Sequence, residues 1–225
     1  MSFAMEHEDE PVYGLPAVPP PDEHVIWQGS PDWKALAIRA FHARKLAVYF
    51  ALMLVLRGVV TLADGGGVLQ ALRDVALLLP LPLIGLALVL VLAWLSARTT
   101  VYTLTNRRVV MRIGIVLTLS FNLPFRCIAA ADMARAPRGT GDIALALAGS
   151  DRIAYLQLWP HARPWQLRKP QPMLRCVPQP DEVAQLLATQ WSALNGMGAQ
   201  PGVASPLQPA TVAATAVPET ALAAH

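Results

Sequence analysis

The chain has 225 residues, of which 54% are hydrophobic and only 15% are charged. Soluble globular domains carry about 25% charged residues, so this composition argues against an ordinary water-soluble protein and favours a membrane protein. The net charge of +3 comes from basic residues that flank the apolar runs instead of forming one patch, which argues against nucleic-acid binding. Cys127 and Cys176 form no C-x-x-C motif, and we expect two reduced thiols.

The first 45 residues predict a leader, a strand and a helix. Residues 1–22 are acidic and proline-rich and lack the features of a secretory signal, so we expect a flexible leader. Residues 23–45 predict a short strand and a basic amphipathic helix, with Ser30 as its cap, Pro31 in its first turn and Trp33 at its start. Such a helix is typical of the bilayer surface, and packing on the protein's own domain is the alternative.

Two apolar runs, 46–63 and 75–95, are each long enough to cross a bilayer as a helix. A glycine-containing turn at 64–74 separates them, so they predict a transmembrane hairpin. Lysine and arginine gather at the outer ends of the hairpin, whereas the turn holds only Arg73. The positive-inside rule therefore predicts cytoplasmic termini and a periplasmic turn.

Arg57 interrupts the first apolar run. A charged side chain within a span is costly, which indicates either a function or a compensating contact. We expect snorkelling or pairing with an acid such as Asp64. Contact with a partner helix or a pigment-protein is the alternative.

Residues 98–195 predict a cytoplasmic domain of six or seven short strands closed by a helix. Strict alternation over 115–123 is typical of a strand, and a hairpin is expected around Asn106 and Arg107. The strands are expected at 100–105, 108–113, 115–123, 126–136, 142–149, 152–159 and 173–177, and the helix at 180–194. We expect a half-closed antiparallel barrel or sandwich, and a disordered Ala/Pro-rich tail at 196–225.

The segments YTLTNRRVVMRIG (102–114) and NLPFRCI (122–128) resemble the bacterial pleckstrin-homology-type domains that are fused to a transmembrane hairpin. The resemblance implies a membrane α + β protein: a two-helix transmembrane hairpin followed by a PH-like antiparallel β-barrel or sandwich capped by a C-terminal helix.

A longer ordered set, which includes WQGSPDW, GTGDIALALAGSDRIAYLQLWPHARPW and PMLRCVP, resembles the photosynthetic-complex assembly proteins of purple bacteria over roughly residues 8–190. This resemblance implies a non-enzymatic factor of the inner, intracytoplasmic membrane. Such a factor helps assemble the reaction centre and its core light-harvesting antenna through protein–protein contact. The resemblance assigns no catalytic residue. A general PH-like membrane-organising or anionic-lipid-binding module is the alternative.

No catalytic set, phosphate loop or paired metal-ligand motif can be assembled from the sequence, so we expect neither an enzyme nor a metal or cofactor site. The candidate contact residues are basic or aromatic. Arg107 and Arg108, at a hairpin tip, suit either anionic lipid headgroups or a solvated turn. The proline-rich loop 158–165 suits either docking to a partner or bilayer, or structural packing. The candidate residues for partner or lipid contact are Arg57, Arg107, Arg108, Trp159, His161, Arg163 and Trp165.

The expected partners are the subunits of the reaction centre and core antenna together with membrane lipids. Nucleic acid is not among them, and a hairpin of this size is compatible with a homodimer.

Overall fold

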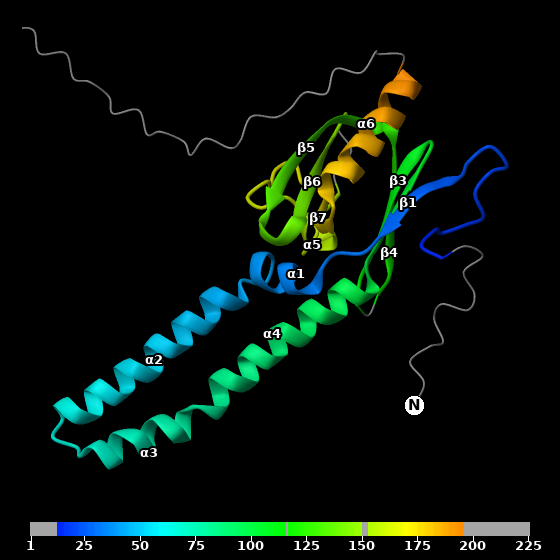
Figure 1. Cartoon of the computed structure of the whole chain (residues 1–225). Helices are drawn as coiled ribbons and strands as arrows, with labels where there is room; N and C mark the ends of the chain where they lie inside the picture. The colour runs from blue at the N-terminus through cyan, green and yellow to red at the C-terminus, as the bar shows by residue number, and fades with distance from the viewer. Residues whose placement is uncertain (1–12, 116, 150–152, 196–225) are drawn as a thin grey trace, which may run out of the picture.

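The computed structural model describes residues 13–115, 117–149 and 153–195, and Figure 1 shows a helical hairpin that projects from a β-rich domain. The first part of the expected flexible leader, residues 1–12, and the expected disordered tail, 196–225, lie outside the described residues.

The hairpin consists of α2 (Ala43–Ala63), α3 (Val68–Leu78) and α4 (Pro80–Thr99). Both α2 and the combined segment Val68–Thr99 are long and apolar enough to cross a membrane, with mean hydropathies of 2.2 and 2.8. Pro80 separates α3 from α4, because its ring removes one helical hydrogen-bond donor.

The turn of the hairpin is shorter than the sequence suggested. It occupies residues 64–67 instead of 64–74, because the helix resumes at Val68. Gly65 has φ +84°, a conformation that glycine adopts without steric cost, which allows the chain to reverse within these four residues.

The domain contains two antiparallel sheets, with strand orders β1-β2-β3-β4 and β5-β6-β7. Among the described residues these sheets remain separate, so the expected closure into one barrel is not observed. Their strands are β1 (Val25–Gly29), β2 (Val101–Thr105), β3 (Arg108–Ile113), β4 (Leu119–Pro124), β5 (Ile128–Ala136), β6 (Thr140–Leu147) and β7 (Met173–Pro178).

One strand of the first sheet precedes the hairpin in the chain. Val25 pairs with Thr105 and Gly29 with Tyr102, so β1 forms the edge of a sheet whose other strands follow α4. The domain therefore extends beyond the expected limits of 98–195, and the hairpin is inserted between its first and second strands.

The core lies between the two sheets and α6 (Pro180–Asn195). Alternate residues of β2 and β3 point into it, including Tyr102, Leu104, Val109 and Met111. Val183 of α6 packs in this core, so α6 closes the space between the two sheets, which confirms the expected closing helix.

Two of the expected strands differ in the structure. Within the expected strand 152–159, of which residue 152 lies outside the described residues, Tyr155–Leu158 form the helical turn α5, and of these four residues only Leu158 is buried. Its alternating apolar residues therefore do not mark one face of a sheet. In 115–123 the strand begins only at Leu119, because Gly114 at φ +129° turns the chain first.

Helix α1 (Trp33–Arg39) packs against the rest of the protein with one face. Its residues Ala35, Leu36 and Ala37 are buried, which agrees with the alternative of packing on the protein's own domain. The cap is Asp32 rather than Ser30, since an Asp32 carboxylate oxygen accepts a hydrogen bond from the backbone N–H of Ala35 at 2.7 Å.

The leader contacts the first sheet at residues 13–15. The carbonyl oxygens of Tyr13 and Gly14 accept hydrogen bonds from the side chains of Gln28 and Thr103, and Leu15 is buried. A Cβ at Gly14 would lie 2.6 Å from the Gln28 amide nitrogen, so glycine permits this close approach to the sheet.

Candidate functional site

The β-rich domain meets the hairpin at a junction formed by α1, the end of α4 and β7. Leu36 of α1 is fully buried and packs in a cluster with Ala97 of α4 and Cys176 of β7. The backbone N–H of Asp32 donates to the carbonyl oxygen of Cys176 at 2.9 Å. The small alanine side chain lets helix and sheet approach closely, so the C-terminal end of α4 is fixed against the domain.

A buried polar chain centred on His161 crosses this junction. Its Nε2 lies 3.1 Å from Thr100 Oγ1 and its Nδ1 lies 2.6 Å from the Tyr102 hydroxyl. The Thr100 hydroxyl donates its proton to the carbonyl oxygen of Ser96. Nε2 must therefore carry the imidazole proton and donate to Thr100, while Nδ1 accepts from Tyr102.

Burial determines the protonation states of His161 and Tyr102. Burial, and then the nearby Arg175 cation, lower the pKa of His161 from 6.5 to about 3. Burial also raises the pKa of the Tyr102 phenol well above its ordinary value. Both groups are therefore neutral at physiological pH, and they connect the loop to β2 and α4 as a hydrogen-bonded bridge.

One ion pair and two hydrogen bonds from a buried arginine strengthen the same junction. The Arg39 guanidinium of α1 lies 2.7 Å from a carboxylate oxygen of Asp142, whose other oxygen accepts the backbone N–H of Cys176 at 2.8 Å. Arg175 of β7 donates to the carbonyl oxygens of Pro160 and Arg39, at 3.0 and 3.2 Å. One network thus joins α1, strands β6 and β7 of the second sheet and the loop that follows α5.

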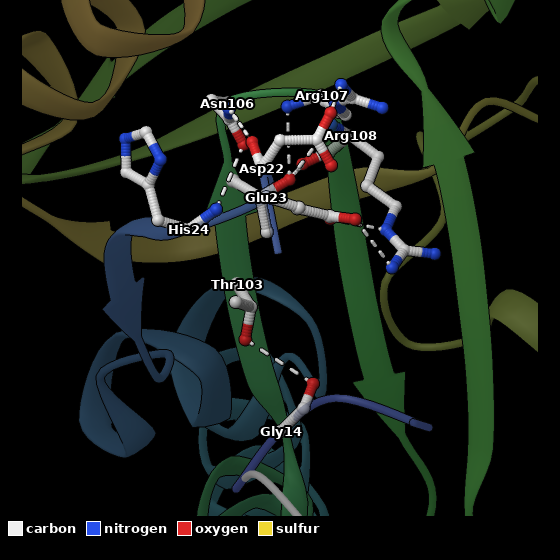
Figure 2. Close-up of polar contacts among 9 residues, drawn as sticks. Gly14, Asp22, Glu23, His24, Thr103, Asn106, Arg107 and Arg108 are labelled. Atoms are coloured by element: carbon white, nitrogen blue, oxygen red, sulfur yellow. Dashed lines mark hydrogen bonds and ion pairs between the residues drawn. The ribbon is translucent and has the colours of Figure 1, made fainter. Parts of the chain in front are cut away.

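The two arginines at the β2–β3 turn bind the last residue of the leader, Asp22, and the residue that follows it, Glu23 (Figure 2). The guanidinium of Arg108 donates to both carboxylate oxygens of Glu23, at 2.6 and 2.9 Å, and the Glu23 side chain is only 3% exposed. Arg107 pairs with Asp22, whose carbonyl oxygen accepts from the Asn106 amide. The whole length of β2 separates this turn from the end of α4, so Arg107 and Arg108 lie away from the hairpin.

Arg57 forms a contact across the hairpin. Its guanidinium lies 2.7 Å from a carboxylate oxygen of Asp74 in α3, and that oxygen also accepts from the Thr61 hydroxyl at 3.0 Å. Pairing with an acid is confirmed, but the acid is Asp74 instead of Asp64. The pair closes the hairpin where α2 and α3 lie side by side.

The aromatic and basic residues of the loop after α5 point in different directions. Trp159 packs edge-to-face on Phe41, with ring centroids 5.2 Å apart. His161 is buried in the junction, and Arg163 pairs with Asp132 at 2.7 Å. Trp165 is 94% exposed. The loop therefore has inward residues that hold it and outward residues that are free to make contacts.

The described residues hold no group of three or more His, Cys, Asp or Glu side chains that could bind a metal ion. Burial, and then the nearby Asp142 carboxylate, raise the pKa of the Cys176 thiol to about 12, so it stays protonated at neutral pH. Sequence reasoning missed Tyr102, Arg39 and Asp142 as junction residues, because their partners lie far away in the chain and no local motif marks them.

The fold and the comparisons with known proteins agree on the class of protein. A family model for the bacterial PH domain matches residues 47–191, so the chain belongs to the bacterial PH domain family. A Rhodobacter capsulatus protein, described as an uncharacterized 23.7 kDa protein in the puhA 5′ region, is 37% identical over 180 residues, which cover 80% of this chain and 84% of the relative. No solved structure matches the chain.

Proposed function

We propose that this chain is a non-enzymatic assembly factor of the PuhB type. It resides in the bacterial inner, intracytoplasmic membrane and helps assemble the photosynthetic reaction centre with its core light-harvesting antenna. It acts by protein–protein contact in and at the membrane, without a cofactor or metal. Its partners are reaction-centre and antenna subunits and membrane lipids.

The observation that carries the proposal is an exposed apolar hairpin fixed against a PH-like domain. Large apolar side chains such as Leu52, Val55, Leu81 and Ile84 are more than half exposed along the hairpin. Surfaces of this kind are covered by lipid or by the helices of a partner. The junction at Leu36 and His161 keeps the domain at one end of the hairpin, where it meets the same partner outside the bilayer.

The distribution of basic residues supports a topology for this hairpin. Arg44 and Lys45 begin α2 and Arg98 lies in the last turn of α4, all at the end that carries the domain. In the proposed topology the chain crosses the membrane twice, and the domain and both termini lie in the cytoplasm.

The photosynthetic role is supported by two observations. The ordered motifs of this sequence resemble assembly proteins of purple bacteria, and the gene of the Rhodobacter capsulatus relative lies in the puhA 5′ region.

Deletion of the gene in a phototrophic host tests the assembly role. We expect reduced near-infrared absorption from reaction centre and core antenna in isolated membranes, restored by the wild-type gene. Restoration by a gene whose hairpin is replaced with an unrelated apolar hairpin would contradict contact through α2–α4. Normal absorption in the deletion strain would reject the assembly role itself.

A second candidate is a general membrane-organising module that binds anionic lipid. The exposed basic residues Arg168 and Lys169 favour it. Cross-linking in pigmented membranes separates the two candidates: the assembly factor is captured with reaction-centre or antenna subunits, whereas the lipid module binds anionic vesicles and captures none of them.

A further inference from the structure

We propose that the segment 155–169, termed here the peripheral loop, is a second membrane contact that rests on an anionic bilayer surface beside the hairpin. The inference depends on the proposed function in one respect only, that the hairpin spans the bilayer. It assigns to the bilayer a group of outward side chains that the junction does not use.

The peripheral loop exposes large apolar side chains at an unusual density. The exposed fractions are 86% for Leu156, 49% for Trp159, 94% for Trp165 and 65% for Leu167. Tryptophan is enriched where an apolar ring meets the headgroup region of a bilayer, and such a cluster is unfavourable in water.

The base of the peripheral loop is held firmly, so these side chains are presented in a defined direction. Ala162 bridges to Pro172, and the backbone N–H of Arg163 donates to the carbonyl oxygen of Gln171 at 2.9 Å. The Arg163 side chain pairs with Asp132, and His161 is buried. Arg163 and His161 are therefore positioning residues, and the contact residues are their outward neighbours.

The peripheral loop also lies at the level where a bilayer would begin. Trp159 packs on Phe41, two residues before α2 starts at Ala43. Figure 1 shows α5 beside α1, whereas the C-terminal end of α6 lies at the opposite end of the domain. The hairpin and the peripheral loop can therefore reach one membrane surface together.

The positive charge of the peripheral loop favours anionic lipid. From residue 153 to residue 180 the sequence has no acidic residue, while Arg168 and Lys169 lie beside the exposed apolar side chains. Both are exposed, and neither forms an ion pair within the described part of the chain. Each such cation strengthens attraction to an anionic surface about five-fold, so the occupant is a bilayer rich in anionic lipid.

Spin labels in the full chain, reconstituted into lipid nanodiscs of equal parts phosphatidylcholine and phosphatidylglycerol, test the proposal. The labels are placed singly by Gln166→Cys in the peripheral loop, Val55→Cys in α2 and Ala193→Cys in α6. Cys127→Ser removes the half-buried native thiol, whereas Cys176 is buried and its high thiol pKa keeps it unreactive. Power saturation with oxygen and with a water-soluble nickel complex then reports the depth of each label.

We expect the label at 166 to lie between the water-exposed label at 193 and the lipid-buried label at 55. Trp165→Ser should abolish this immersion, and Arg168→Gln with Lys169→Gln should weaken it, whereas the exposed control Arg126→Gln should leave it unchanged. Nanodiscs of phosphatidylcholine alone should reduce the immersion.

Three outcomes overturn the proposal in distinguishable ways. If the label at 166 is as accessible to nickel as the label at 193 while the label at 55 is in lipid, the peripheral loop does not touch the bilayer, and the proposed function stands. If the label at 166 becomes protected only when reaction-centre or antenna proteins are added, the loop is a protein docking site. If the label at 55 is also in water, the spanning hairpin itself is wrong.

Discussion

Asp22 and Glu23 are neighbours that pair with neighbouring arginines, yet their surroundings differ. The Glu23 side chain is 3% exposed and that of Arg108 is 20% exposed, whereas those of Asp22 and Arg107 are 62% and 50% exposed. Water screens the outer pair and leaves the inner pair strong, so the two pairs contribute unequally to holding the leader.

Glu23→Ala should therefore lower the free energy of unfolding by about 2 kcal/mol, because it leaves a partly buried guanidinium without its carboxylate. The matched control Asp22→Ala should cost less than about 1 kcal/mol. Thermal unfolding of both variants in the same detergent measures the difference. Equal losses would show that the leader is held by its backbone contacts instead.

His161 is the residue whose burial predicts a pH dependence. Its pKa in the folded protein is about 3, below the ordinary value of 6.5, so between these values only the unfolded chain takes up the proton. Stability is therefore fully present above about pH 6.5 and is lost as the pH falls toward 3, with a slope of up to about 1.4 kcal/mol per pH unit.

His161→Gln should be less stable than the wild type at neutral pH, because the Tyr102 hydroxyl and the Thr100 hydroxyl lose their hydrogen bonds to the imidazole ring. It should also lose much less stability than the wild type between pH 6.5 and pH 4. Unfolding midpoints across this range provide the test. Parallel pH profiles for the two proteins would contradict the buried neutral imidazole.

At the scale of elements, the hairpin is closed by a polar contact within apolar helices. Asp74 of α3 accepts from both Arg57 and Thr61 of α2. In a bilayer an arginine without this partner would face lipid at a cost of a few kcal/mol. Packing and the ion pair therefore act together to keep α2 and α3 side by side.

Asp74→Leu should destabilise the hairpin by about 2 kcal/mol, whereas the double variant Arg57→Leu with Asp74→Leu should recover most of that loss. Resistance to unfolding by denaturing detergent, measured for the wild type, the single variants Arg57→Leu and Asp74→Leu, and the double variant, gives the coupling energy. A double variant as unstable as Asp74→Leu would assign Arg57 a role outside the hairpin.

At the scale of the whole molecule, the hairpin interrupts the domain instead of preceding it. β1 and α1 come from before α2, but they complete the first sheet and the junction with β7. The fold therefore needs both sides of the hairpin, whose two ends are joined to the domain through α1 and β2.

A fragment of residues 98–195 should consequently fail to fold, because it lacks β1 and exposes the surface that Leu36 covers. A fragment that joins residues 13–41 to 98–195 by a flexible linker should fold in water. Near-ultraviolet circular dichroism and dispersion of amide proton NMR signals distinguish the two. A folded 98–195 fragment would show that β1 and α1 are dispensable.

The sequence by itself determined the elements whose signal is local. The apolar runs around 46–63 and 75–95, the β2–β3 hairpin and the stripe of α6 all follow from hydrophobic periodicity and turn chemistry. The sequence also predicted that Arg57 needs a compensating partner. These features depend on residues close together in the chain, so local sequence is enough to predict them.

Only the tertiary structure decided which distant residues meet. It paired Arg57 with Asp74, placed β1 beside β2 and buried His161 between Thr100 and Tyr102. It also turned 155–158 into a helical turn and left Trp165 exposed while Arg163 pairs with Asp132. Such contacts depend on how surfaces are buried across the whole chain, because desolvation and packing, not local propensity, select the partner of each polar group.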